Sequence, residues 1–96
     1  MSIQFMQWRN WNAKARSVMP IVLREGPYRF FFYSSDRDEP QHVHAAHDNR
    51  VAKFWLDPVR LQRSGGLRRS EIHRIQQIIE KHHRLLMEAW NDYFDD

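Results

Sequence analysis

The chain has no cysteine and only three glycines among its 96 residues. Without cysteine there is no disulfide, no thiolate zinc site and no cysteine nucleophile, so a bound metal would have to rest on histidine and carboxylate ligands. No apolar run approaches the ~20 residues that a transmembrane helix requires, and residues 1–20 lack the continuous apolar core of a secretion signal. We therefore expect a cytoplasmic protein with no membrane contact.

Aromatic side chains are plentiful, since six Phe, four Trp and three Tyr make up 14% of the residues. This content argues against general disorder, and a chain this small depends on large aromatic side chains for its core. The net charge is only +3, but it is unevenly spread: residues 59–70 hold four arginines and no acid, whereas residues 71–96 hold more acids than bases. A net charge of +3 alone is too small to indicate nucleic-acid binding. Residues 1–19 also hold three bases and no acid, so a partner would meet two positive segments and an acidic C-terminal segment.

The pattern of apolar residues predicts the secondary structure. Strands are expected at residues 21–23, 28–33, 42–46, 50–56 and, as a short edge strand, 59–61. Turn residues 47–49 should join two of them as a hairpin, and residues 34–41 should form a polar loop. Apolar residues at a three–four spacing predict one helix over residues 68–94.

These elements predict an α+β fold, a four- to five-stranded antiparallel sheet with one long C-terminal helix packed on one face. Phe30, Phe32 and Phe54 are expected in the core, with Val43 and Ala45 facing the helix. Residues 19–96 should form a single domain. Residues 1–18 should be an N-terminal extension or arm, either helical or loosely ordered.

Several short motifs occur in a characteristic order: Met19-Pro20-x-Val22-Leu23, Tyr28-Arg29-Phe30-Phe31-Phe32-Tyr33-Ser34, Glu39-Pro40-x-His42-Val43-His44, Ala52-Lys53-Phe54-Trp55-Leu56 and Glu88-Ala89-Trp90-Asn91-x-Tyr93-Phe94. Over about residues 19–94 the chain thereby resembles a small bacterial family of unknown function, number 4160 in the domain-of-unknown-function series. Its members are often encoded beside another small protein, in pairs resembling toxin–antitoxin systems. The resemblance implies a cytoplasmic protein with a small protein partner, and it implies no particular activity.

The pair His42-x-His44 is the first candidate for chemistry. Residues two apart on a strand share a face and lie ~6.5–7 Å apart. Two imidazoles so placed can serve as acid and base on a phosphodiester, or they can bind one metal ion. A coordination shell would be completed from the flanking side chains Asp36, Asp38, Glu39, His47 and Asp48. The plainer alternative is the polar face of an edge strand.

The neighbouring strand extends this candidate site. If Phe54 joins Val43 against the helix, Lys53 and Trp55 share the outer face with the two histidines. Arg29 and Tyr33 are expected on the same face. This set predicts a metal-independent ribonuclease without a cofactor, in which His42 and His44 are acid and base, Lys53 and Arg29 stabilise the phosphate, and Trp55 and Tyr33 contact the nucleic acid. The same face could instead dock a protein without catalysis, as an exposed tryptophan often indicates.

A basic loop surrounds Gly65 and Gly66, and its arginines are candidate nucleic-acid or partner contacts: Arg60, Arg63, Arg68 and Arg69. Glycine permits close backbone approach, and a helix N-terminus attracts anions, so a phosphate could bind here; a solvated loop is the alternative. His82 lies on the apolar stripe of the helix and is expected in the core or an interface, away from His83.

The sequence thus supports two functional hypotheses of different classes. The first is a component of a toxin–antitoxin-type pair that acts on RNA. The second is a non-enzymatic module that docks a partner protein, with a homodimer as a variant. A histidine–carboxylate metal site is a third alternative.

Overall fold

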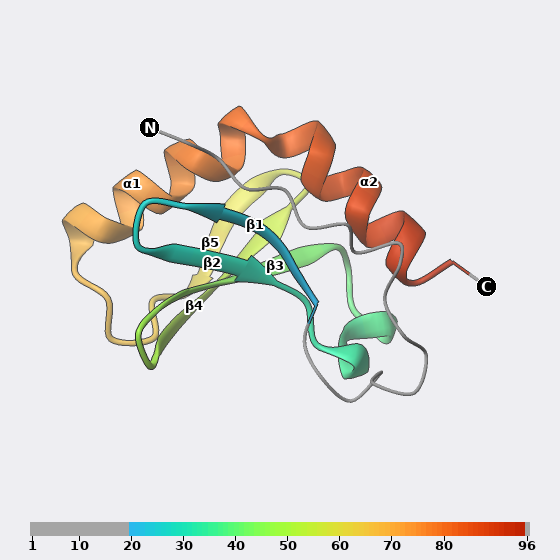
Figure 1. The fold of residues 1–96 in the computed structure, drawn as a ribbon, viewed down its shortest axis with the longest axis horizontal. Coiled ribbons are helices and arrows are strands. Elements are labelled where there is room, and N and C mark those ends of the chain that lie inside the picture. The colour runs from blue at the N-terminus through green and yellow to red at the C-terminus, as the bar shows by residue number, and fades with distance from the viewer. Residues whose placement is uncertain (1–19, 96) are drawn as a thin grey trace.

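The sheet is a five-stranded antiparallel meander in the computed structural model, which describes residues 20–95. Each strand pairs with its neighbours in sequence (Figure 1). The strands are β1 (Ile21–Glu25), β2 (Tyr28–Phe31), β3 (His42–His47), β4 (Arg50–Leu56) and β5 (Val59–Arg63). The predicted sheet is confirmed, and the extension expected at residues 1–18 lies outside the described residues.

The hairpin of β3 and β4 fixes the faces of the sheet. Val43 pairs with Phe54 and Ala45 with Ala52, and all four are fully buried in the core. Phe30 and Phe32 join the same core, as predicted. Because side chains alternate along a strand, the residues between them point to the opposite face.

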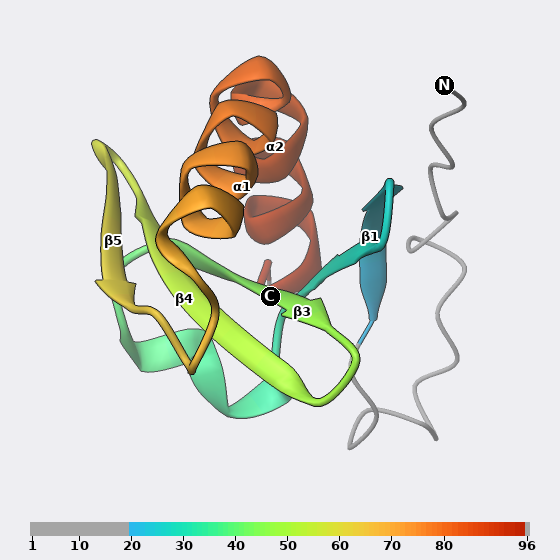
Figure 2. The ribbon, with the colours of Figure 1, turned by 90° about the vertical axis from the view of Figure 1, so that its left-hand side faces the viewer.

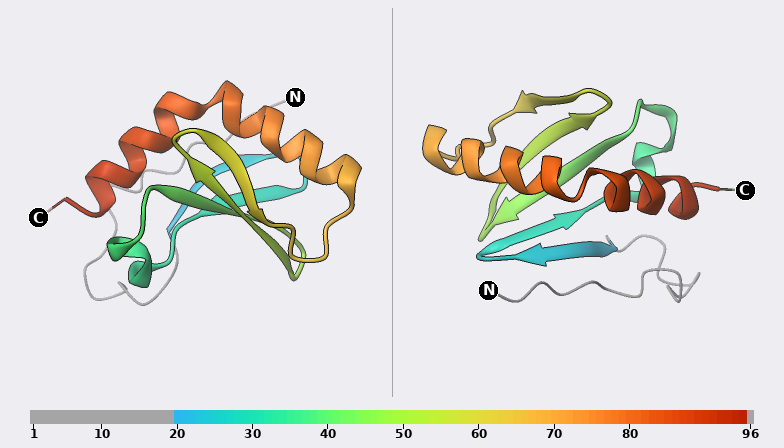
Figure 3. Two further views of the ribbon diagram at one scale, coloured as in Figure 1. Left: turned by 180° about the vertical axis from the view of Figure 1, so that it is seen from behind. Right: turned by 90° about the horizontal axis from the view of Figure 1, so that it is seen from above.

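Two helices, α1 (Arg69–Lys81) and α2 (His83–Tyr93), cross one face of the sheet (Figures 1 and 3). Their buried side chains, among them Ile75, Ile79 and Leu86, complete the core. The prediction of one long helix is therefore only approximate. Among residues 20–95, no helix is long and apolar enough to cross a membrane.

The helix is interrupted at His82, whose backbone leaves helical geometry at φ −111° and ψ 25°. Both histidines at this point bond to the sheet: His82 Nε2 lies 3.0 Å from Glu25 Oε1, and the His83 ring bonds the carbonyl oxygen of Leu56. The expectation that His82 belongs to an interface is confirmed. The break in the helix therefore coincides with two contacts to the sheet.

Residues 34–41 do not form a simple polar loop. Ser34–Asp38 form a short 3₁₀ helix, η3, in the connection between β2 and β3. η3 lies on the side of the sheet opposite to α1 and α2, below one end of β3 (Figure 2). Asp36 is its one buried residue. This connection determines the environment of the candidate site.

Candidate functional site

The site is built on the outer face of β3 and β4. His42 pairs with Trp55 across the two strands, and His44 pairs with Lys53. The His42 and Trp55 rings meet edge to face, with centroids 5.7 Å apart. The shared face predicted for these four side chains is therefore confirmed.

The two histidines are not on an open surface, and in this respect the sequence-based prediction was wrong. His42 is 0% exposed, His44 is 3% exposed and Lys53 is 9% exposed. η3 folds over this end of the outer face, and Trp90 of α2 lies against the His42 ring, with centroids 5.0 Å apart. An acid–base pair for RNA cleavage needs contact with the phosphodiester, and this conformation does not provide it.

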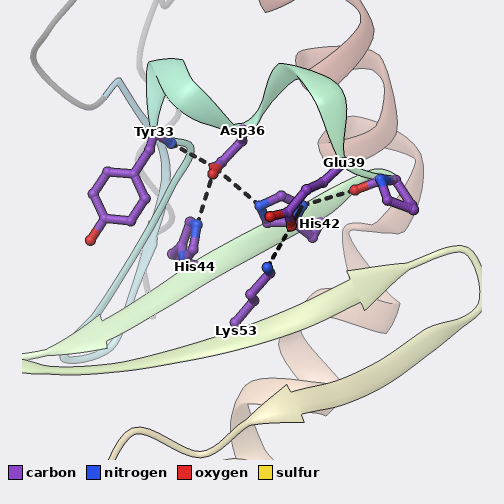
Figure 4. Close-up of polar contacts among 7 residues, drawn as sticks. Tyr33, Asp36, Glu39, His42, His44 and Lys53 are labelled. Carbon is purple, nitrogen blue, oxygen red and sulfur yellow. Dashed lines mark hydrogen bonds and ion pairs between the residues drawn. The ribbon is translucent and has the colours of Figure 1, made fainter.

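One oxygen of Asp36 is the centre of the site (Figure 4). Asp36 Oδ2 accepts a hydrogen bond from the Tyr33 backbone N–H at 2.8 Å, and it lies 3.1 Å from Nε2 of both His42 and His44. Burial would raise the pKa of the Asp36 carboxyl, but its contacts with His42, His44 and the Tyr33 amide outweigh burial and hold the pKa below its ordinary value. Asp36 therefore remains a carboxylate although it is buried.

His42 has its two ring nitrogens facing two oxygens. Nδ1 lies 2.8 Å from the carbonyl oxygen of Pro40, which can only accept, so Nδ1 carries a proton and donates it. Nε2 lies 3.1 Å from Asp36 Oδ2 but does not form a hydrogen bond there, and it has no other hydrogen-bond partner among residues 20–95. With Nδ1 donating to Pro40, Nε2 and Asp36 Oδ2 attract one another only when a positive charge lies on or between them. That charge is either a proton on Nε2, which makes the ring an imidazolium paired with Asp36, or another cation.

His44 is held by aromatic rings as well as by Asp36. Its ring stacks on Phe31, with centroids 5.6 Å apart, and lies 4.4 Å from the Tyr33 ring. Its Nε2 bonds Asp36 Oδ2, while its Nδ1 is buried without a hydrogen-bond partner among the described residues. The orientation of the ring is therefore set by packing on both sides.

Lys53 forms an ion pair at the rim of the site. It is therefore not free to bind a phosphate in this conformation. Its Nζ donates to Glu39 Oε1 at 2.6 Å and lies 4.9 Å from the centre of the Trp55 ring. The hydrogen bond from Lys53 lowers the pKa of the Glu39 carboxyl. Glu39 Oε1 also lies 3.7 Å from His42 Nδ1, so the pair borders the histidine.

The remaining predicted site residues divide into two groups. Tyr33 belongs to the site through its backbone and ring. Arg29 does not, because its Nη2 donates to the carbonyl oxygen of Asp48 in the turn between β3 and β4. His47 likewise turns away, with Nδ1 2.6 Å from Glu71 Oε1 on α1.

The four arginines of the basic segment are exposed, as the sequence suggested: Arg60, Arg63, Arg68 and Arg69. Of the two glycines, Gly65 lies directly against the backbone of β4, so its place in the loop is explained by packing. Gly65 has φ +62°, and a Cβ there would overlap the Val51 carbonyl, so its small size serves packing of the loop against β4.

Asp36 is the residue whose importance the sequence understated. It appeared only as one of five flanking side chains that could complete a metal shell. The close set that the structure brings together is Asp36, His42 and His44, with one candidate ligand atom from each residue within 4.8 Å of the others. No local signal shows Asp36 pointing inward, because that depends on how η3 folds back onto β3.

Comparison with known proteins identifies the family of this chain but assigns no activity to it. No curated protein matches the chain, and no solved structure matches it. A family model described as a domain of unknown function, DUF4160, matches residues 28–91. This range contains η3, α1, most of α2 and every strand of the sheet other than β1. This chain belongs to the DUF4160 family.

Proposed function

We propose that this chain is a binding component of a two-protein pair of the toxin–antitoxin type, acting in the cytoplasm, and that it holds its partner along β5. The observation that carries the proposal is that β5 is the last strand of the sheet and that every residue from Arg60 to Arg63 is exposed. The outer edge of a terminal strand presents backbone N–H and C=O groups to which an extended segment of another protein can add a strand.

Charge indicates what kind of segment would bind. Arg60, Arg63, Arg68 and Arg69 make no ion pair within residues 20–95, and residues 59–70 contain no acid. Arginine binds carboxylates through two parallel hydrogen bonds, which gives both affinity and orientation. An acidic, extended segment of a partner protein therefore fits this edge.

The outer face next to β5 favours protein over RNA. Trp55 pairs with Arg60 across β4 and β5, but its ring is half-buried and lies beneath the Lys53 ammonium. Stacking of bases requires an open aromatic face. Trp55 thus supports a protein contact better than a nucleotide contact.

The test measures binding of a fluorescent ten-residue peptide that alternates Glu and Val. Arg60→Glu should weaken this binding about tenfold or more, because it replaces an attraction by a repulsion. Arg84→Glu is the control: it makes the same charge change at an exposed position of α2, and binding should persist. Affinity should also fall as salt rises. Equal binding by both variants, or association only with a second copy of the chain, would contradict the proposal.

The ribonuclease hypothesis remains a prediction with a direct test of its own. It requires His42 and His44 to reach RNA, although both lie beneath η3. If the hypothesis is right, the purified chain cleaves single-stranded RNA and the double variant His42→Ala/His44→Ala does not. We expect no cleavage by either protein, because neither ring is accessible.

A further inference from the structure

The cluster beneath η3 has the composition of a metal site. From Asp36, His42 and His44 we infer that this chain binds one divalent transition-metal ion, with zinc as the representative ion, through two imidazole nitrogens and one carboxylate oxygen. The inference goes beyond the proposed function and does not depend on partner binding at β5. It rests on the positions of the ligand atoms, on an unpartnered nitrogen and on the charge of the cluster.

Two of the three ligand-atom separations suit one ion directly, because both Nε2 atoms lie 3.1 Å from Asp36 Oδ2. All three ligand atoms lie within 4.8 Å of one another, so binding of an ion requires the two histidine nitrogens to close their remaining separation and His44 Nε2, which bonds Asp36 Oδ2, to release its proton. Two atoms that each bind zinc at about 2.0–2.2 Å lie about 3–3.5 Å from one another, depending on the angle between the bonds. Imidazole with carboxylate is a ligand set that suits zinc, iron, nickel or copper, whereas magnesium and calcium prefer oxygen ligands alone.

The hydrogen bonding of His42 independently leaves a place for a cation beside Nε2. Because Nδ1 donates its proton to the Pro40 carbonyl, a neutral ring leaves Nε2 with a lone pair. Nε2 is fully buried and lacks a hydrogen-bond partner among residues 20–95, yet a carboxylate oxygen lies 3.1 Å away. A metal-binding histidine characteristically donates its other ring N–H to a backbone carbonyl in this way.

Formal charge points in the same direction. With both imidazoles neutral, Asp36 and Glu39 outnumber the single cation Lys53 in this group. A dication would offset that excess and would connect η3, which carries Asp36, to β3, which carries both histidines. The ion would thereby hold the connection between β2 and β3 against the sheet.

The experiment uses the full chain, purified without a polyhistidine tag and without chelators. After EDTA treatment, zinc is titrated against a colorimetric chelator, and metal content is measured by elemental analysis. We expect one zinc per chain and a higher Tm with zinc than with EDTA. The variants Asp36→Asn and His44→Gln should each bind zinc at least about tenfold more weakly, because each loses a ligand.

A matched control separates this site from incidental surface binding. His73→Gln removes an exposed histidine of α1 and should bind zinc as the unaltered chain does. If a ligand variant fails to fold by circular dichroism, the ring ¹⁵N resonances of the unaltered chain decide the question: Nε2 of His42 and His44 should shift on zinc addition. Absence of stoichiometric zinc, unchanged affinity in folded ligand variants, or shifts confined to other histidines would overturn the inference.

Discussion

Replacing Gly65 by alanine should destabilise the fold more than the same change at Gly26. Both glycines have a positive φ, +62° and +60°, so alanine at either position incurs the left-handed backbone cost of about 1–2 kcal/mol. They differ in their surroundings. A Cβ at Gly65 would lie 2.5 Å from the Val51 carbonyl carbon and closer still to its oxygen, whereas a Cβ at Gly26 meets nothing within 4 Å.

The clash gives the expected difference. The loop would have to move away from β4, which disturbs the packing of Leu67, a residue that is 6% exposed and part of the core. Overpacking of this kind costs about 1–3 kcal/mol. Gly65→Ala should therefore lower the free energy of unfolding by about 1–3 kcal/mol more than Gly26→Ala does.

Urea unfolding of the two variants and the unaltered chain measures this difference directly, provided that the m-values agree. In a domain of this size, each kcal/mol corresponds to about 4–8 °C in Tm, so thermal unfolding offers a second measurement. Equal destabilisation by the two substitutions would refute the argument, because it would mean that the Val51 carbonyl does not restrict position 65.

Two further predictions concern the ionised groups of the site. Lys53→Met should raise the pKa of Glu39 toward its ordinary value, since the hydrogen bond from Lys53 is the main cause of its lowering; an NMR titration that finds no change would contradict this pairing. The folded-state pKa of Asp36 is lowered, so in metal-free protein Asp36 contributes stability that is present above its unfolded pKa of about 3.9 and is lost as pH falls below it. The Asp36→Asn variant should thus be less stable than the unaltered chain at neutral pH, and its free energy of unfolding should fall less steeply between roughly pH 5 and 2. Urea unfolding of both proteins over this range measures the two slopes. Identical slopes would show that the carboxylate is not stabilised by its neighbours.

Most of the sheet could be predicted because its information is local. The alternation of residues 42–46 and 50–56 and the turn between them predict a hairpin, and pairing Val43 with Phe54 against the helix was a condition of the predicted outer face. Under that condition the sequence placed Lys53 and Trp55 on the face of His42 and His44, whereas the register that pairs His42 with Trp55 and His44 with Lys53 comes from the structure. Each of these conclusions needs only neighbouring residues.

The features that sequence reasoning missed depend on distant contacts. Burial of the histidines requires η3 to fold back over β3, which no periodicity in residues 34–41 reveals. The helix break is hidden for a similar reason: the apolar spacing continues through His82, and the interruption coincides with bonds to Glu25 and Leu56 on the sheet. Tertiary structure overrides a regular pattern at both places.

The sequential strand order has a consequence for how the chain folds. Each strand pairs only with its predecessor and successor, and the turns after β1, β3 and β4 each contain two residues. Closing such short loops costs little chain entropy, so each of these hairpins can form before the next segment is in place. The strands can therefore pair in the order of the sequence, and α1 and α2, which follow β5, bury the apolar face of the sheet and complete the core.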